Sequence, residues 1–545
     1  MKDIVIKQKQ PSLLYEVIDD MFLLTKRGTN IKTELYAGML MFFEVICMSA
    51  VCAQLIASRA GIASFSTVYF GMILMTVCGT ILTGLVCNAP VIQSMSMGTV
   101  VLIVSTMSTY LGMTLSNVLF IAMVSNAIYL VVMVIPPLRS FISNAVPRQI
   151  KKALPAALGG YLLVYALTQL NVFGITTNNY NTVLEGMAAA GEALPYWGVN
   201  AYSFTAENAA FGGWYAQTAI ITAMVGFTAM TVLHARKFKH ATILSFGITL
   251  LAFVAMWLIR GNFMDYYFYA FITPSYGSMY FYDSIQRIFG EFQATMLLKP
   301  ITEGMDFSKY VTYLTYLESQ ATGVAMDQIT VDATGNIVMA VVTTALSFLT
   351  LGVSETAAGI HGSAFAAKAY DEDGNVVFME HPGLGILGKI LNLHSMTALV
   401  STVGCALGMG PVTIRPETAV GGKEGGKSGL AALVAGALSI VALFNLVFSA
   451  LFLNGIVVFG ILLFVAMSLM ESFKDCDFTD TASAIPFAAT VAAAAVTQNL
   501  ASGILLGIAL DTAVKLISGK FRQIHPGAWV FALVFLATLA LHFYK

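Results

Sequence analysis

The segment LTLGVSETAAGIHGSAFAAKA (residues 349–369) is apolar and rich in glycine, yet it contains a glutamate, Glu355. A second segment of the same character, GCALGMGPVTIRPETAVGGKEGGKSG (residues 404–429), contains Glu417. A carboxylate at bilayer depth costs at least about 3 kcal/mol, so an acid retained there is a candidate functional residue. Paired acids on interrupted apolar segments are typical of a transporter's binding site.

The composition indicates a polytopic membrane protein. The chain has 545 residues, of which 57% are hydrophobic and 10% are charged, whereas a soluble chain carries roughly 25% charged residues. A membrane span needs about 20 apolar residues, and about fourteen stretches are candidates. The formal net charge of −1 gives no indication of a nucleic-acid partner. We expect a multi-pass protein of the cell (inner or plasma) membrane, surrounded by the lipid bilayer.

The distribution of Lys and Arg predicts the orientation, because short cytoplasmic loops carry an excess of these residues. The N-terminal arm is basic, and further basic clusters follow the fourth and sixth predicted spans. Residues 171–213 contain no Lys or Arg. The N-terminus is therefore expected in the cytoplasm and residues 171–213 outside.

The predicted spans form two sets of seven. A repeat with an odd number of spans must insert the second time with opposite topology, which predicts an inverted 7+7 repeat. The expected divisions are a cytoplasmic arm (1–32), a first repeat (33–260, with the external loop 171–213), an external loop (261–336), a second repeat (337–520) and a C-terminal apolar segment (521–545). The run 526–543 could be an extra span or an interfacial helix.

Helical periodicity is interrupted at corresponding places in the two halves. Residues 93–98 alternate polar and apolar side chains, and residues 412–415 do the same, as in extended strands. Pro416 then suits the first turn of a helix. Because non-helical backbone at membrane depth persists only inside protein or beside a cavity, we expect two crossing strands at a binding site. Ordinary loops at the membrane edge are the alternative.

Each acid also has a structural alternative. Glu355 could form an ion pair or a hydrogen bond between helices, although Gly359 and Gly362 on its helical face would allow close approach to it. Arg415 shares a face with Glu417 if the segment is extended, so it could neutralise that acid or meet an anionic substrate. Glu44, a third intramembrane acid, could be a polar contact between helices.

Several motifs together resemble a known family. They are ETAVGGKEGGKSGL (417–430), SETAAG (354–359) followed by DEDG (371–374), TELYAGMLMFFEVICMSA (33–50), NAVPRQIKKAL (144–154) and DFTDTASAIPFAATV (477–491). The chain resembles the nucleobase:cation symporter-2 (xanthine/uracil permease) family, and within it the adenine/guanine/hypoxanthine permease branch.

The resemblance implies an all-α fold of fourteen transmembrane segments with core and gate domains, short strands in spans 3 and 10, and a nucleobase bound between acids of spans 8 and 10. It implies substrate-binding acids Glu355 and Glu417, with Gly98, Thr413 and Ile414 beside them. Our own candidates add Arg415, which replaces a usually uncharged residue of the family, and Thr418 to the substrate site. Our proton-coupling candidates are Glu44, Glu355 and Glu417. Val100 and Thr397 stand where the family has Asn and Asp, which leaves the particular base and the coupling ion open.

The chemistry of the acids suits such a substrate. One carboxylate can accept two adjacent N–H groups from the edge of a purine or pyrimidine. A carboxyl group removed from water also retains a proton more readily, so one acid could bind a proton outside and release it inside. We predict proton-coupled import of a nucleobase, with a purine favoured by the resemblance and no cofactor or metal.

The coupling ion, the oligomeric state and the alternative functions stay open at this stage. Na⁺ could replace the proton, and the protein could form a homodimer. An anion transporter or exchanger on the same fold is the alternative function, favoured by Arg415 and opposed by the two acids. A membrane enzyme comes third, because no metal-ligand cluster or nucleophile–base pair occurs in the sequence.

Overall fold

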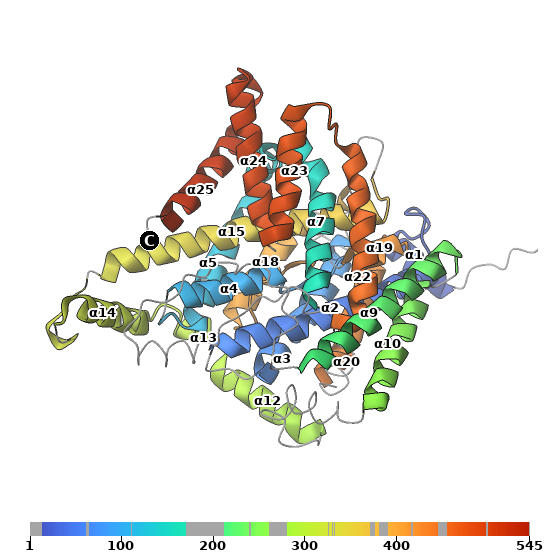
Figure 1. Cartoon of the computed structure of the whole chain (residues 1–545), viewed down its shortest axis with the longest axis horizontal. Coiled ribbons are helices and arrows are strands. Elements are labelled where there is room, and N and C mark those ends of the chain that lie inside the picture. Colours follow the sequence, from blue (N-terminus) through green and yellow to red (C-terminus); the bar gives the residue numbers. More distant parts are fainter. Residues whose placement is uncertain are drawn as a thin grey trace, which may run out of the picture.

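The computed structural model describes most of the chain (Figure 1). The described residues are 13–60, 65–110, 112–169, 212–238, 241–260, 281–324, 326–329, 331, 333–370, 376–380, 391–415, 418–444, 455–497 and 500–543.

Helices dominate both halves of the chain. The first half contains α1 (Leu13–Phe22), α2 (Ile31–Ala60), α3 (Phe65–Cys87), α4 (Met97–Thr109), α5 (Leu115–Val134), α6 (Pro136–Ala145), α7 (Arg148–Gln169), α9 (Gly212–Ala235) and α10 (Ala241–Arg260). The second contains α12 (Phe281–Thr295), α13 (Lys299–Thr302), α14 (Ser308–Thr322), α15 (Ala333–Ala366), α16 (Val377–Glu380), α18 (Leu393–Ala406), α19 (Ala419–Lys423), α20 (Gly429–Phe444), α22 (Gly455–Leu469), α23 (Thr481–Thr497), α24 (Leu500–Ile517) and α25 (Pro526–Phe543). Short 3₁₀ turns lie at Met326–Gln328, Met470–Asp475 and Phe521–Gln523.

Helices from the two halves pack together in two groups. In the first group, α3 and α2 pack against α20, and α5 packs against α18 and α15. In the second, α7 packs against α22 and α23, α23 against α24, and α9 against α10 and α22. Helix α15 also contacts α7 and α24, so it connects the two groups.

Two short strands lie at the two interruptions that the sequence indicates. Strand β1 (Gln93–Ser94) pairs antiparallel with β2 (Thr413–Ile414), with Gln93 opposite Ile414 and Ser94 opposite Thr413. Helix α4 begins three residues after β1, and the short helix α19 follows β2. The pairing satisfies backbone groups that a membrane interior would otherwise leave without partners.

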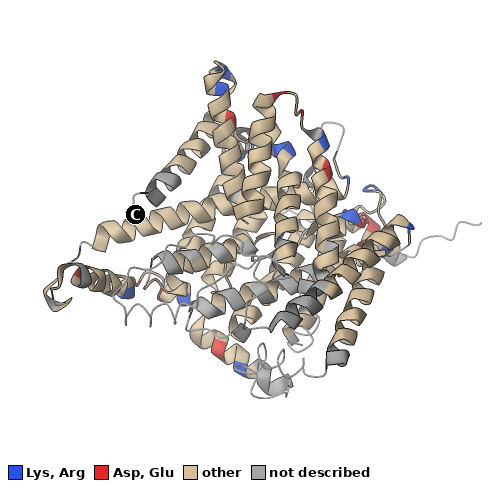
Figure 2. Cartoon of the chain, viewed as in Figure 1, with Lys and Arg blue, Asp and Glu red and all other residues tan. Residues whose placement is uncertain are grey.

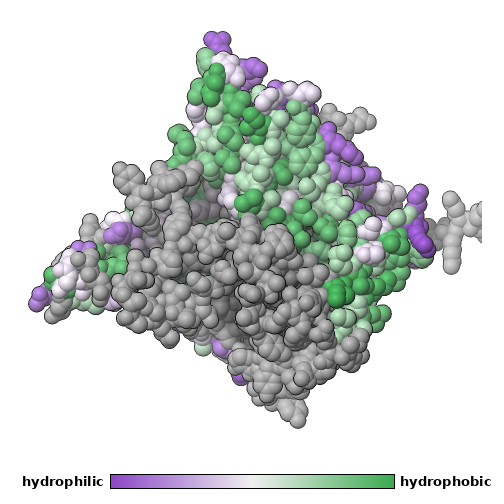
Figure 3. Space-filling model, in the orientation of Figure 1, coloured by the Kyte–Doolittle hydropathy of each residue, from purple (hydrophilic) through white to green (hydrophobic). Residues whose placement is uncertain are grey.

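The distribution of apolar residues fits a protein embedded in lipid. Three helical stretches of the described residues are long and apolar enough to cross a membrane: Thr67–Cys87, Leu115–Val134 and Ala333–Ala366. In Figure 2 most of the coloured positions, which mark charged residues, lie near the ends of the helices. Figure 3 shows a mostly apolar surface over α9, α10, α24 and α25, with hydrophilic residues at its rim. Leu251 of α10 is 70% exposed and Leu533 of α25 is 62% exposed.

The arm that precedes α2 is attached to the loop before α20. Arg27 is buried and donates hydrogen bonds to the carbonyl oxygens of Asn88 and Lys427. Burial lowers the pKa of Arg27 to about 10, so the guanidinium remains protonated near neutral pH. Glu34 accepts hydrogen bonds from the backbone N–H groups of Lys427, Ser428 and Ala431. It therefore places negative charge at the N-terminus of α20, where the helix dipole favours it.

Part of the predicted loop 261–336 is helical and anchored to the bundle. Phe292 of α12 packs against Phe70 of α3, with ring centroids 5.6 Å apart. Asn117 at the start of α5 donates hydrogen bonds to the carbonyl oxygens of Gly304 (3.0 Å) and Asp306 (2.9 Å). The sequence predicts this segment as an external loop that could be a lid or a contact to neighbours. In the structure, its described part packs against α3 and is hydrogen-bonded to α5.

The C-terminal apolar run is one continuous helix, α25. It packs against α24 and α6, and in Figure 1 it descends at an angle from the end of α24.

Candidate functional site

The carboxylate of Glu355 lies inside the protein, where α15 passes the two strands. Its side chain is buried, with the residue only 2% exposed. Its Oε2 atom accepts hydrogen bonds from the hydroxyl groups of Ser96, Thr413 (3.0 Å) and Thr99 (3.4 Å). These donors come from both interrupted segments, so one acid joins two regions that are distant in the sequence.

The local structure of the first interruption explains why Ser96 can reach the acid. Ser96 is the N-cap of α4, with extended backbone angles of φ −81° and ψ 164°. Its Oγ atom accepts a hydrogen bond from the backbone N–H of Thr99 at 3.1 Å, as N-cap side chains do. The same hydroxyl donates its proton to Glu355. The cap thus fixes the direction of the donor.

Gly98 lies directly against the other carboxylate oxygen. A Cβ atom added at Gly98 would overlap the Oε1 atom of Glu355. Any residue with a side chain would therefore have to displace the acid, and glycine at this position allows the backbone of α4 to approach it.

Buried hydroxyl and amide groups hold β1 in place. Gln93 donates from Nε2 to the Thr397 hydroxyl at 2.9 Å, and its backbone N–H donates to Thr80 Oγ1 at 3.1 Å. The hydroxyls of Thr76 and Ser94 are 2.7 Å apart. Thr397, which replaces an acid of the family pattern, is therefore a positioning partner of the strand.

The predicted residues after β2 contact the first interruption. The Thr418 hydroxyl accepts a hydrogen bond from the backbone N–H of Ile92 at 3.3 Å. Arg415 is fully buried; its backbone N–H donates to the Ile92 carbonyl at 3.0 Å, and its Nη1 atom donates to the Met95 carbonyl. Ile414 is also fully buried.

The two glycines on the face of Glu355 contact protein segments. A Cβ atom at Gly359 would lie 2.6 Å from the Ile414 carbonyl oxygen. A Cβ atom at Gly362 would overlap the Leu158 side chain of α7. The sequence predicts a helix face of small residues beside Glu355. In the structure, this face of α15 packs against β2 and α7.

The structure brings together Gly98, Glu355 and Thr413, and it places Ile414, Arg415 and Thr418 on the same pair of interrupted segments. Glu417 lies outside the described residues, and for Glu44 only the helical backbone is described. Sequence reasoning missed Ser96 and Thr99 as partners of the acid. Their signal is a serine directly before an apolar helix with a hydroxyl residue three positions later, a typical N-cap pattern.

Within the described residues, no group of three or more His, Cys, Asp or Glu side chains could hold a metal ion.

A mostly helical, apolar chain, with helices that begin beside paired strands around a buried acid, defines a multi-pass membrane transporter. No protein-family model matches the sequence. The guanine/hypoxanthine permease PbuO of Bacillus subtilis (strain 168) is 23% identical over 527 residues, which cover 95% of this chain and 99% of that protein. The guanine/hypoxanthine permease GhxP of Escherichia coli O157:H7 is 28% identical over 202 residues, or 37% of this chain and 42% of that protein.

The adenine permease AdeP of Escherichia coli (strain K12) is 23% identical over 184 residues, covering 33% of this chain and 41% of that protein. These relatives are consistent with the purine branch of the nucleobase permease family, and they confirm the resemblance that the motifs indicate. The named relatives are permeases, so the chain is a transporter and not an enzyme.

Two solved structures also align with the chain. The transmembrane domain of the cyanobacterial bicarbonate transporter BicA has a TM-score of 0.40 at 11% identity, covering 87% of this chain and 97% of that chain. SLC26A9 has a TM-score of 0.41 at 10% identity, covering 93% of this chain and 70% of that chain.

Proposed function

We propose that this protein imports a purine nucleobase, coupled to a proton gradient, with the base bound between Glu355 and Glu417. The observation that carries the proposal is the buried Glu355 carboxylate, oriented by hydroxyl donors from both interrupted segments. A carboxylate held in one orientation can accept N–H groups from the edge of a purine. The relatives named as guanine/hypoxanthine and adenine permeases support the substrate class.

The proposed coupling follows from the location of the acids. A carboxyl group inside a membrane protein is costly as an anion and retains a proton more readily than one in water. Protonation from outside and release inside would then accompany each base. Glu355 and Glu417 are the principal proton carriers in this proposal, and Glu44 is the third candidate.

The proposed architecture is fourteen spans in an inverted 7+7 repeat, with the N-terminus in the cytoplasm. The first helix group would be the core domain, because it contains both interrupted segments, and the second would be the gate domain. Movement of one group against the other around a fixed site would give alternating access.

The test is uptake into proteoliposomes that contain the full chain. Radiolabelled guanine, hypoxanthine, adenine and uracil are compared with and without an inward proton gradient, and with Na⁺ replaced by K⁺. We expect purine uptake that depends on the proton gradient. Uptake driven by Na⁺ alone would refute proton coupling, and uptake of uracil without competition by purines would refute the substrate class.

Substitution of the acids tests the site. We expect Glu355→Gln and Glu417→Gln each to abolish accumulation while the protein still folds and inserts. Glu303→Gln is the matched control, because Glu303 is exposed at the end of α13 and pairs with Lys299. Wild-type accumulation by either site variant would remove that acid from the proposal.

A second candidate, anion transport or exchange, is favoured by the fully buried guanidinium of Arg415. Uptake of labelled inorganic anions into the same proteoliposomes, with no uptake of purines, would support this candidate.

A further inference from the structure

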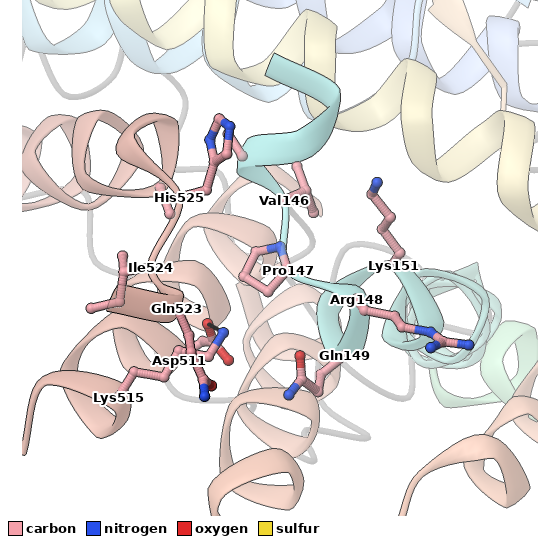
Figure 4. Close-up of a pocket in the computed structure, with 12 residues that line it drawn as sticks. Val146, Pro147, Arg148, Gln149, Lys151, Asp511, Lys515, Gln523, Ile524 and His525 are labelled. Atoms are coloured by element: carbon pink, nitrogen blue, oxygen red, sulfur yellow. Dashed lines mark hydrogen bonds and ion pairs between the residues drawn. The ribbon is translucent and has the colours of Figure 1, made fainter. Parts of the chain in front are cut away.

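A pocket of about 460 Å³ lies where α7 begins and α24 ends, on elements that do not form the site around Glu355. Figure 4 shows Arg148 and Lys151 at the start of α7, with the Arg148 guanidinium extending away from the other side chains. Asp511, Lys515 and Gln523 lie together on the other side of Pro147. The pocket therefore lies within the second helix group, at the ends of its helices.

The charges around the pocket are mainly positive. Arg148, Lys151 and Lys515 contribute three cations, and Asp511 is the one acid among the described lining residues. Asp511 is 3% exposed and forms a 2.6 Å ion pair with Lys515. Because that pair largely neutralises itself, Arg148 and Lys151 leave the pocket with a net positive charge.

Exposed apolar residues lie on the two helices that border the pocket, α6 and α25. The Phe141 ring of α6 lies 5.1 Å from the ring of His525, a lining residue that directly precedes α25. Val530 is 53% exposed and Leu533 is 62% exposed along α25, and Phe141 itself is 39% exposed. A cationic pocket is thus lined in part by helices that also carry exposed apolar side chains.

We propose that this pocket binds the phosphate headgroup of an anionic phospholipid, whose acyl chains lie along the exposed side of α25 and α6. Basic pockets between membrane helices recognise such headgroups, and the adjoining apolar surface suits the chains. A soluble phosphate compound would match the cations equally well, but it would leave the apolar surface unused. The combination of charge and apolar surface therefore favours the lipid.

The experiment measures phospholipid binding to the purified full chain in detergent. Native mass spectrometry and displacement of a fluorescent phosphatidylglycerol compare dioleoyl-phosphatidylglycerol with dioleoyl-phosphatidylcholine. We expect tighter binding of phosphatidylglycerol. Removing one cation should weaken this binding about fivefold, and the double variant Arg148→Gln/Lys151→Gln should weaken it about thirtyfold. Lys151→Arg, which retains the charge, should bind nearly as the wild type does.

The control variant Lys520→Gln/Arg522→Gln removes the same charge from exposed residues beyond α24 that do not line the pocket. We expect it to bind phosphatidylglycerol within about twofold of the wild type, since surface attraction is weak when salt screens it. Equal losses in the control and pocket variants would show diffuse surface attraction and overturn the proposal. Undiminished binding in the pocket variant, despite a correctly folded protein by size-exclusion chromatography, would overturn it as well.

A third arm distinguishes the source of the phosphate. Inorganic phosphate and glycerol phosphate are added as competitors at millimolar concentration. Failure of both to displace the fluorescent lipid supports a lipid site. Displacement by either at micromolar concentration would assign the pocket to a soluble phosphate compound and refute the lipid.

Discussion

Thr413 on β2 donates a 3.0 Å hydrogen bond to the Oε2 atom of Glu355 on α15. The same oxygen accepts a hydrogen bond from Ser96, which precedes α4 in the other half of the chain. Glu355 is therefore the point where both interruptions and the long helix α15 meet.

Removing a hydroxyl donor should disturb the orientation of Glu355. We expect Thr413→Val to reduce uptake at least tenfold, because a hydrogen bond to a charged group is worth about 1.5–3 kcal/mol. Thr413→Ser retains the hydroxyl and should keep most of the activity. Initial rates of purine uptake in proteoliposomes check both, and equal activity of the valine and serine variants would contradict the role of this bond.

Adding one methyl group at Gly98 should displace the carboxylate. Gly98→Ala places a Cβ atom on the Oε1 atom of Glu355, so we expect uptake to fall to background while the protein still inserts. Gly247→Ala on α10 is the matched control, because a Cβ atom there meets nothing within 4 Å. Expression, membrane insertion and uptake are measured for both variants, and normal uptake by Gly98→Ala would show that the acid can move without loss of function.

Neutralising Glu34 should destabilise the start of α20. Its carboxylate accepts three backbone N–H groups there, and a neutral amide can replace only part of this arrangement. We expect Glu34→Gln to cost about 1–3 kcal/mol of folding free energy, seen as a lower apparent melting temperature in detergent. Glu16→Gln on the exposed side of α1 is the control and should leave the melting temperature unchanged. A similar decrease in both variants would argue against the cap.

Releasing Asn117 should detach the segment between α13 and α14. Asn117→Ala removes both hydrogen bonds to the carbonyl oxygens of Gly304 and Asp306. We therefore expect faster proteolysis within residues 299–322, measured by limited digestion of the protein in membranes. Thr114→Ala removes the N-cap hydroxyl of α5, including its hydrogen bond to Asn117 Oδ1, but leaves the Asn117 Nδ2 donor that bonds Gly304 and Asp306. If Thr114→Ala accelerated cleavage as much as Asn117→Ala does, the effect would come from a weakened α5. The proposed anchoring role of Asn117 would then be refuted.

Physical reasons explain why the sequence alone could predict a membrane transporter. Long apolar stretches cannot remain in water, and acids such as Glu355 inside them are too costly to be retained without a role. Proline, glycine and the alternating pattern around residues 93–98 and 412–415 predicted extended backbone there. Strands form at Gln93–Ser94 and Thr413–Ile414, although Met97 and Gly98 already belong to α4. The resemblance of the motifs to purine permeases, now confirmed by the relatives, rests on the order of residues alone.

Only the tertiary structure shows which residues far apart in the sequence contact one another. Ser96 and Thr413 donate to the same oxygen of Glu355, although the intervening sequence separates Ser96 and Glu355 by 259 positions. Local periodicity reports the face of a helix but not its neighbour, so it could not show that Gly359 accommodates β2 or that Gly362 meets α7. The basic pocket beside α25 likewise exists only because α6 and α24 end close to the point where α7 begins. Hydrogen bonds and close packing between elements far apart in the sequence are properties of the tertiary structure, and they turned separate candidate residues into a site.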